Sequence, residues 1–408
     1  NLAWLHERTG DQALLAAIDQ NLVFMNHTVA PEPNGQWLGA SSFCHRTPGD
    51  WTHPQWGAGL GMLNDELPSA AAHVGHTWPV EETARTVDGR RTPAHNLARR
   101  LQFLPNNAFA EPQSGGTIIS SGPGLEFRAW QYHHESSVTV ALPLLQQDRF
   151  TRIFGDELFA ARRPAYYAFT YAGAPMGQWQ KERRPADAHR QFPNNGGGLC
   201  MFWSPRFGSS ILAKNWSAYS AQSIIAESAD GRTAWEDYWS IHAQFDDKAG
   251  CARVTGRIIE QPLSFQRNVE CLDDGVRMEL TVQSEQAVAL RTMWECFPFP
   301  LDKVGGLQAI PVDLQGRMVK SGPAHAVVFR SQSDEVHLLV FDSPRVCNVG
   351  RERSTDVYGS PHEHGRVLAA LPAEWSSGME HRTKWMLMAV PSEAIPAAIT
   401  RATDLMRN

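Results

Sequence analysis

Residues 263–284 read LSFQRNVECLDDGVRMELTVQS, and this stretch predicts a β-hairpin. On both sides of the turn signal Asp273-Asp274-Gly275, apolar and polar residues alternate with a period of two, which is typical of strands with one buried face. Similar segments recur after about residue 115, separated by turn signals such as SGPG and NNGGG. About fifteen antiparallel strands in one run predict a large β-sandwich.

The start of the chain follows the helical period instead. Across residues 1–28, apolar side chains recur every three to four positions, which predicts two helices. Gly10 can end the first helix and Asp11 can cap the second. Further helices are expected at 54–76 and, with a weaker pattern, at 79–103.

Length and period together predict two domains. The chain has 408 residues, which is too many for one small core. We expect helical hairpins over residues 1–110 and the antiparallel β-sandwich over 111–408, with one helix at 148–163 interrupting the strands. The expected fold class is therefore α+β multidomain.

Composition argues against several classes of protein. The chain is 42% hydrophobic and 20% charged, as in ordinary soluble globular proteins. Its net charge of −6 argues against a nucleic acid or an anionic membrane as the main partner. No apolar run reaches the roughly 18 residues of a membrane-spanning helix. No signal peptide is visible, and because the first residue is Asn1, we expect a piece of a longer protein rather than a chain whose leader was removed.

Short motifs exclude some familiar active sites. Six cysteines are scattered through the chain without a C-x-x-C motif, which argues against a zinc ribbon or a thioredoxin-like site. We expect buried free thiols, with disulfides in an exported protein as the alternative. The motifs H-E-x-x-H and G-x-S-x-G are absent, which argues against a zinc protease and a serine hydrolase of the α/β type.

Three stretches carry a resemblance to a class of enzymes: WLHERTGDQALL at 4–15, HRTPGDWTHPQWG at 45–57, and the strand succession that ends in HRTKWMLMAVP at 381–391. Together they resemble the polysaccharide lyases of toroid type, which include hyaluronate, alginate and heparinase-like lyases. The resemblance implies the C-terminal part of an (α/α) toroid followed by a large antiparallel β-sandwich. It also implies a missing N-terminal part of the polypeptide that completes the toroid.

The resemblance further implies a secreted or periplasmic enzyme that cleaves a uronate-containing polysaccharide by β-elimination. Such an enzyme needs a base for the proton beside the carboxylate, a group that neutralises the enolate-like charge, and an acid for the leaving oxygen. Its expected partner is an acidic polysaccharide. No cofactor is required, and a structural divalent cation is compatible with the fold.

The irregular loop at 45–57 supplies candidates for two of these roles. Arg46 can clamp a carboxylate with two hydrogen bonds, and His45 or His53 can neutralise it or accept a proton. Trp51 and Trp56 can stack on sugar rings. The alternative is that the charges of the loop pair with one another and the two tryptophans fill the end of the barrel.

A second set of candidates lies on an expected strand. Alternation places Trp130, Tyr132 and His134 on one face, where Tyr132 would be the base of the lyase, His134 its partner and Trp130 a sugar platform. A nearby cation would lower the pKa of the phenol toward the working range. The alternative is an edge strand with solvated histidines. Asn195 and Trp216 are further candidates for contacts with the substrate.

Two further patterns have alternative interpretations. RRPAYYAFTYAG at 162–173 is expected to be a core strand, although Arg162 and Arg163 could meet an acidic ligand. His362 and His364 stand two positions apart, as metal ligands on one face of a strand sometimes do, or they belong to a polar loop.

Two other functions remain open from the sequence. The same architecture occurs in glycoside hydrolases, and a hydrolase would depend on carboxylates such as Asp50 and Glu135. The chain could also be a non-catalytic, glycan-binding portion of a larger enzyme.

Overall fold

The computed structural model describes residues 2–33, 37–40, 63, 66–77, 140–173, 196–213, 221–237, 240–301, 306–355 and 361–407. Of these residues, 53% lie in strands and 18% in helices. Contacts divide the chain into one unit of residues 1–38 and 52–147 and a second unit of residues 39–51 and 148–408. None of the described helices is long and apolar enough to cross a membrane.

The first unit begins with the helical hairpin that the sequence predicts. Gly10 joins the two helices with a φ of 67°, a left-handed conformation that glycine adopts without strain. Asp11 then caps the second helix, because its carboxylate accepts a hydrogen bond from the Ala13 amide at 2.9 Å. The elements here are α1 (Leu2–Thr9), α2 (Gln12–Met25), β1 (Val29–Pro31), which pairs with β2 (Trp37–Gly39), α3 (Pro68–Thr77) and α7 (Pro143–Gln146).

The expected fold class is wrong. In place of the C-terminal part of an (α/α) toroid, the described residues contain one helical hairpin and a few separate helices. Most of the described residues form β-sheet, which curls into a half-barrel. The helical period at 1–28 predicts a hairpin, but a period cannot show how many more hairpins follow. The helix expected at 148–163 is also wrong, because this segment forms two paired strands joined at Gly155, where φ is 55°. The helix expected at 79–103 lies outside the described residues.

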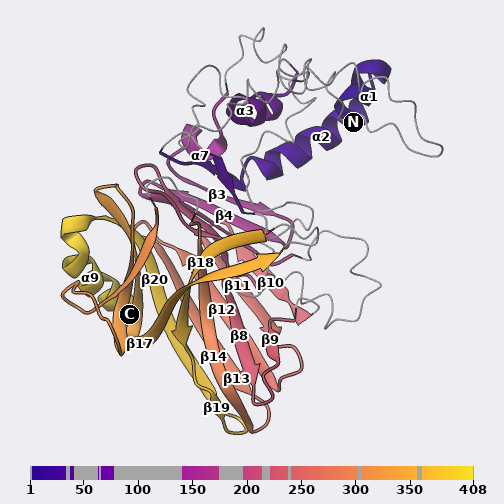
Figure 1. The fold of residues 1–408 in the computed structure, drawn as a ribbon. Coiled ribbons are helices and arrows are strands. Elements are labelled where there is room, and N and C mark those ends of the chain that lie inside the picture. The colour runs from indigo at the N-terminus through magenta and orange to yellow at the C-terminus, as the bar shows by residue number, and fades with distance from the viewer. Residues whose placement is uncertain are drawn as a thin grey trace. The chain divides into compact units, whose positions relative to one another are not determined.

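The described strands of the second unit form two antiparallel sheets (Figure 1). The five-stranded sheet consists, in order, of β3 (Phe150–Phe154), β4 (Leu158–Arg163), β5 (Tyr166–Tyr171), β6 (Leu199–Ser204) and β7 (Gly208–Leu212). The 13-stranded sheet has the order β10-β11-β12-β13-β20-β17-β18-β14-β8-β9, with β15 and β16 added at β17 and β19 at β14.

The strands of the large sheet are β8 (Ser223–Ser228), β9 (Thr233–Trp235), β10 (His242–Asp246), β11 (Cys251–Arg257), β12 (Leu263–Cys271), β13 (Val276–Ser284), β14 (Val288–Phe299), β15 (Gln308–Val312), β16 (Pro323–Arg330), β17 (Glu335–Thr355), β18 (Pro361–Ala370), β19 (Glu374–Trp375) and β20 (Glu380–Pro391). The hairpin predicted at 263–284 is β12 and β13, paired from Leu263 opposite Ser284 to Cys271 opposite Val276. Five of the cysteines are described, and all are free thiols: Cys200, Cys251, Cys271, Cys296 and Cys347.

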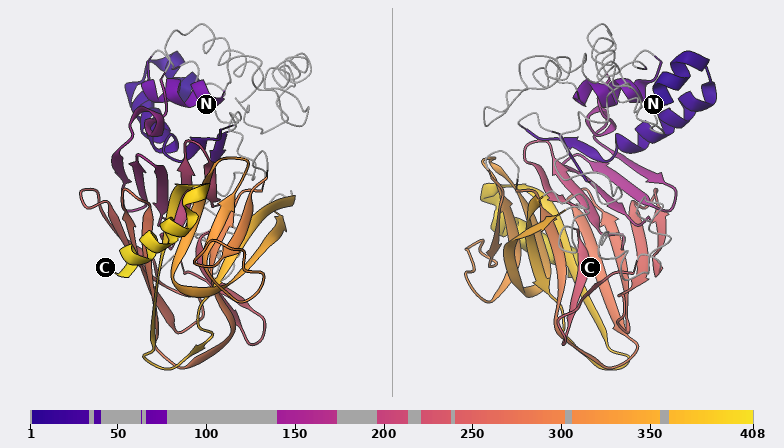
Figure 2. Two further views of the ribbon diagram at one scale, coloured as in Figure 1. Left: turned by 90° about the vertical axis from the view of Figure 1, so that its left-hand side faces the viewer. Right: turned by 45° about the vertical axis from the view of Figure 1, so that its right-hand side comes forward.

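The inner face of the large sheet packs against the five-stranded sheet. One buried cluster takes side chains from both, including Phe159, Tyr166 and Phe202 of the small sheet and Phe341 and Trp385 of the large one. Burial of such large side chains is the main favourable contribution to folding. The two sheets are therefore layers of one core (Figure 2).

The half-barrel of the large sheet brings the ends of β9 and β11 together. Just beyond β9 and β11, the Asp237 amide donates to Arg257 O at 2.7 Å and the Ile259 amide donates to Trp235 O at 2.8 Å. A second apolar cluster lies inside this curl and joins β8, β9 and β14 with β12 and β13; its members include Ile224, Ala234, Met293, Phe265 and Leu280. The curl therefore makes one face of β10 to β13 internal and leaves the other external.

A buried ion pair crosses the interior of the curl. Arg267 on β12 contacts the Glu236 carboxylate just after β9, and both side chains are 0% exposed. Arg267 also donates to Gly196 O at 2.6 Å. A Cβ at Gly196 would lie 2.5 Å from Arg267 Nη1 and 2.7 Å from Glu236 Oε2, so a larger residue there would displace the ends of the paired side chains.

A second buried carboxylate lies on β14 and is fully engaged. Glu295 accepts hydrogen bonds from Trp385 Nε1 at 2.8 Å, Gln222 Nε2 at 3.0 Å and Arg345 Nη1 at 3.1 Å. Three donors compensate for the loss of water around this charge. These contacts tie β17, β20 and the residue just before β8 to the same carboxylate.

We predict that Arg267→Met destabilises the protein by about 3–5 kcal/mol, because it leaves Glu236 buried without its cation. Burial raises the pKa of Glu236, and Arg267 opposes that rise. Without Arg267 the pKa of this carboxyl should rise further, so stability is lost most at high pH and recovers as the pH falls and Glu236 becomes neutral. Urea unfolding at several pH values measures both effects. A loss that does not change with pH would contradict this account, and Arg267→Met combined with Glu236→Leu should recover part of the stability.

Candidate functional site

All ten residues that the sequence proposes for a site fall outside the described residues. Their expected roles in catalysis and substrate binding therefore stay predictions. The ten residues are His45, Arg46, Trp51, His53, Trp56, Trp130, Tyr132, His134, Asn195 and Trp216.

The interpretation of 162–173 as a core strand is confirmed, and a ligand role for its arginines is wrong. Both guanidinium groups are buried and bind backbone carbonyls: Arg163 Nε donates to Cys271 O at 3.1 Å, and Arg162 Nη1 donates to Tyr166 O at 2.8 Å. Burial lowers the pKa of Arg162. Burial also raises the pKa of Tyr167 well above its usual range. These groups hold strands together and do not reach a substrate.

Other chemically suggestive groups of the described core are also inaccessible. Ser204 Oγ lies 2.8 Å from His337 Nε2, and Ser210 Oγ lies 2.7 Å from His337 Nδ1, but all three residues are 0% exposed. Burial raises the pKa of Cys271 to about 12, so its thiol is a poor nucleophile. His364 is buried as well, and no group of metal-binding side chains occurs in the part of the chain that the structure describes.

The outer face of β10 to β13 and β20 differs from these buried sites, because it carries an ordered array of accessible polar side chains. The strand register aligns His242, Thr255, Gln266, Thr281 and Arg382 in one row across all five strands. Neighbouring strands lie about 4.8 Å apart, and successive outward residues on one strand lie about 6.7 Å apart. The array is therefore a regular lattice of hydrogen-bonding groups.

Two more rows flank this central row. On one side, Arg257, Ser264, Gln283 and Glu380 oppose one another in turn. On the other side stands a row that joins β10 to β20: Gln244, Arg253, Asn268, Glu279 and Lys384.

The outer face is hollowed over the first two rows. The hollow has a volume of about 520 Å³ and is lined from β10 to β20. Four hydroxyl groups border it, from Ser240, Thr255, Ser264 and Thr281. Its other side-chain polar groups belong to His242, Arg257, Gln266, Gln283, Glu380 and Arg382. The lining can therefore donate and accept hydrogen bonds over its whole width.

The charged groups of the hollow are paired at its rim. Arg257 contacts Glu285, and Arg382 lies 3.4 Å from Glu380 and 3.8 Å from Glu279. Both arginine side chains are 58% exposed. Ion pairs exposed to this degree contribute only about 0–1 kcal/mol each. A ligand group can therefore replace the partner of either arginine at little cost.

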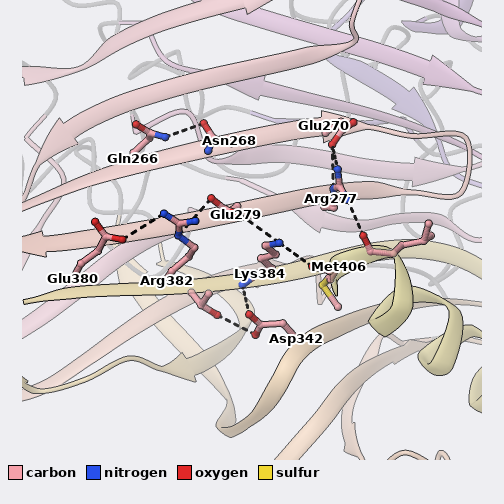
Figure 3. A network of polar contacts seen from close by, with 12 residues as sticks. Gln266, Asn268, Glu270, Arg277, Glu279, Asp342, Glu380, Arg382, Lys384 and Met406 are labelled. Carbon is pink, nitrogen blue, oxygen red and sulfur yellow. Dashed lines mark hydrogen bonds and ion pairs between the residues drawn. The ribbon is translucent and has the colours of Figure 1, made fainter. Parts of the chain in front are cut away.

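Polar contacts continue from the hollow to the C-terminal helix (Figure 3). Gln266 Nε2 donates to Asn268 Oδ1 at 3.2 Å, and Lys384 Nζ lies 3.7 Å from Glu279. Helix α9 (Ile395–Arg407) follows a short 3₁₀ turn and packs on β17 and β20 through Ile395, Ile399, Ala402 and Met406. The array thus adjoins the helix that covers the neighbouring part of the sheet.

Two cations of the same outer face, Arg277 on β13 and Lys384 on β20, cap the end of α9. Arg277 Nη1 donates to Leu405 O at 2.7 Å, and Lys384 Nζ donates to Met406 O at 2.8 Å. The last carbonyls of a helix lack partners within the helix and carry partial negative charge. The two side chains donate hydrogen bonds to these carbonyls, place positive charge beside them and fix the helix end to the sheet.

The hollow is suited to binding rather than to acid–base catalysis. Its titratable groups other than arginine are His242 on β10 and Glu380 on β20, which lie four strand spacings, or about 19 Å, apart along the sheet. Paired catalytic groups of a glycosidase lie within about 10 Å of each other. No described acid–base pair of the lining can therefore act on one bond.

The sequence indicates the polar residues of this site but not their arrangement in rows. Outward residues such as Gln266 and Thr281 are visible as the polar half of an alternating pattern. The pairing of β13 with β20, which brings Arg382 beside Thr281, joins segments about a hundred residues apart, and periodicity carries no information about such pairing.

Comparison with known proteins gives likeness of structure only. No family model matches the sequence, and no curated protein matches it. A xanthan lyase from Paenibacillus has a TM-score of 0.45 at 10% identity, over 98% of this chain and 44% of that one. A chondroitin AC lyase from Streptomyces coelicolor A3 has a TM-score of 0.42 at 11% identity, over 89% and 48%.

A heparan sulfate lyase from Pedobacter heparinus has a TM-score of 0.42 at 8% identity, over 93% of this chain and 55% of that one. The chain thus spans about half the length of these solved structures. Polysaccharide lyases are thus among the solved structures that resemble this chain, as the sequence predicts, whereas the toroid of the expected fold class is not found among the described residues. At TM-scores below 0.5 the likeness says nothing of ligand or reaction.

We predict that Lys384→Met loosens the end of α9, because Met406 O loses its cationic donor. The expected loss is about 0.3–1 kcal/mol, seen as faster hydrogen exchange in the last turn of the helix. Arg382→Met is the matched control, since it removes a cation two residues away on the same strand face that contacts Glu279 and Glu380 rather than the helix. Equal exchange in the two variants would contradict the capping role.

Proposed function

We propose that this chain binds a polysaccharide on the outer face of β10 to β13 and β20. The observation that carries the proposal is the hollow of about 520 Å³, with hydroxyl, amide and guanidinium groups drawn from five adjacent strands. Sugars present hydroxyl groups that both donate and accept hydrogen bonds, and the lining offers both kinds of partner. The strand spacing of about 4.8 Å is comparable with the length of one sugar unit.

Other ligand classes fit this surface less well. A nucleic acid needs an excess of cations along its path, whereas the two arginines of the hollow already face carboxylates. An apolar ligand needs apolar walls, and the outward side chains of the two lining rows are polar. A hydroxyl-rich chain can form hydrogen bonds with the array and needs neither an excess of cations nor apolar walls.

We further propose that the chain belongs to a lyase that cleaves a uronate-containing glycan by β-elimination and acts outside the cytoplasm. In this proposal His45, Arg46, His53, Tyr132 and His134 supply the base, the neutralising group and the acid. A glycoside hydrolase would instead leave saturated ends. A non-catalytic binding portion would bind the polymer without cleaving it.

Incubation with uronate polymers separates these possibilities. A lyase produces an unsaturated uronate that absorbs in the ultraviolet together with new reducing ends. A hydrolase gives reducing ends without ultraviolet gain, and a binding portion gives neither. Absence of ultraviolet gain with every uronate polymer tested would contradict the lyase proposal while leaving the binding proposal to its own test.

We predict that Thr281→Ala and Arg382→Ala each weaken polysaccharide binding about two- to tenfold, because each removes one hydrogen-bonding group from the central row. Isothermal titration with hyaluronate and polygalacturonate oligomers measures the change. Arg291→Ala is the control, since Arg291 is similarly exposed and paired with a carboxylate but lies on β14. Binding that is unchanged in both lining variants would contradict this location of the site.

A further inference from the structure

We infer that this surface selects glycans of low charge density, with at most one carboxylate per disaccharide and no sulfate. The inference rests on the proposed function and concerns the same hollow. It follows from how the charges around the hollow balance. It is independent of which sugar the chain contains.

The fixed charges at the hollow cancel. Its cations are Arg257 and Arg382. Lys384 is a third cation, because it shares the carboxylate of Glu279 with Arg382. The carboxylates in contact with these three cations are also three in number: Glu279, Glu285 and Glu380. A highly charged chain gains attraction only from a surplus of opposite charge, and the three ion-paired cations provide none.

The carboxylates also stand where a polyanion would lie. Glu380 ends the same row that begins with Arg257, and Glu285 contacts Arg257 at the other end of that row. A single ligand carboxylate can replace one of these partners, because exposed ion pairs are weak. Sulfate groups at every sugar would face the remaining carboxylates and meet like-charge repulsion.

One cation is placed to receive a single carboxylate. Among the described residues, Arg253 contacts no carboxylate; its guanidinium donates to Gln266 Oε1 at 3.2 and 2.7 Å. Gln266 in turn lines the hollow. Arg253 therefore offers a free charge beside the central row, and the neutral groups between the arginines receive hydroxyls.

The test compares polymers that share one backbone and differ only in charge. Isothermal titration uses carboxyl-reduced hyaluronate, hyaluronate and chemically sulfated hyaluronate, and then the equivalent three forms of polygalacturonate, all at physiological salt. We expect hyaluronate, its carboxyl-reduced form or carboxyl-reduced polygalacturonate to bind, whereas polygalacturonate itself, with a carboxylate on every sugar, should bind more weakly than its reduced form. The sulfated form of the backbone that binds should bind about five- to tenfold more weakly, as two like-charge contacts of the size of an exposed ion pair require.

Two variants sharpen the test. Glu285→Gln combined with Glu380→Gln should bring the affinity for the sulfated polymer close to the affinity of the same variant for the parent polymer. Arg253→Ala should weaken binding of the parent polymer and not of the carboxyl-reduced form. Because Glu285, Glu380 and Arg253 are exposed, urea unfolding should show wild-type stability for both variants.

The outcomes separate this inference from the proposed function. Tighter binding of the sulfated polymer by the wild-type chain, or an unchanged preference in the double glutamine variant, overturns the inference and leaves polysaccharide binding in place. Failure of every polymer to bind overturns the proposed function, and the inference with it.

Discussion

The buried pair of Arg267 and Glu236 is the contact on which the second unit depends. It joins β12 near one end of the 13-stranded sheet to the segment just after β9 at the other end. Two charges without solvent are tolerated only when each has its partner, so the pair stabilises the closed curl and opposes any other register of these strands. Gly196 lies against both side chains, and a larger residue at this position would have to displace them.

The curl also explains why the candidate surface is polar. Closing the sheet gives β11 to β13 one face toward the interior and one toward water, and alternation assigns every second residue to each. The inner face packs on the apolar clusters, while the outer face keeps Thr255, Gln266 and Thr281 in one row. Helix α9 covers the adjacent part of the outer face, so the array remains open only over β10 to β13 and β20.

The sequence predicted the local elements far better than their assembly. Alternation placed the hairpin 263–284 with its turn, and Gly10 with Asp11 placed the break between α1 and α2, because both signals act over a few residues. Alternation could not show that Arg267 on the apolar face is compensated by Glu236, thirty-one positions away. The toroid is an expectation from the resemblance of three stretches and is not found among the described residues, and the segment 148–163 forms two paired strands in place of the expected helix. The rows of the candidate site depend on pairing between distant strands, which no short pattern encodes.

The central claim is that a glycan lies across the outer face of β10 to β13 and β20. The most direct measurement is photo-crosslinking with a uronate oligosaccharide that carries a photoreactive group, followed by mass spectrometry of the labelled peptides. The account predicts labelling within residues 240–284 and 380–384 that an excess of unlabelled oligosaccharide suppresses. Suppressible labelling confined to other parts of the chain would contradict it.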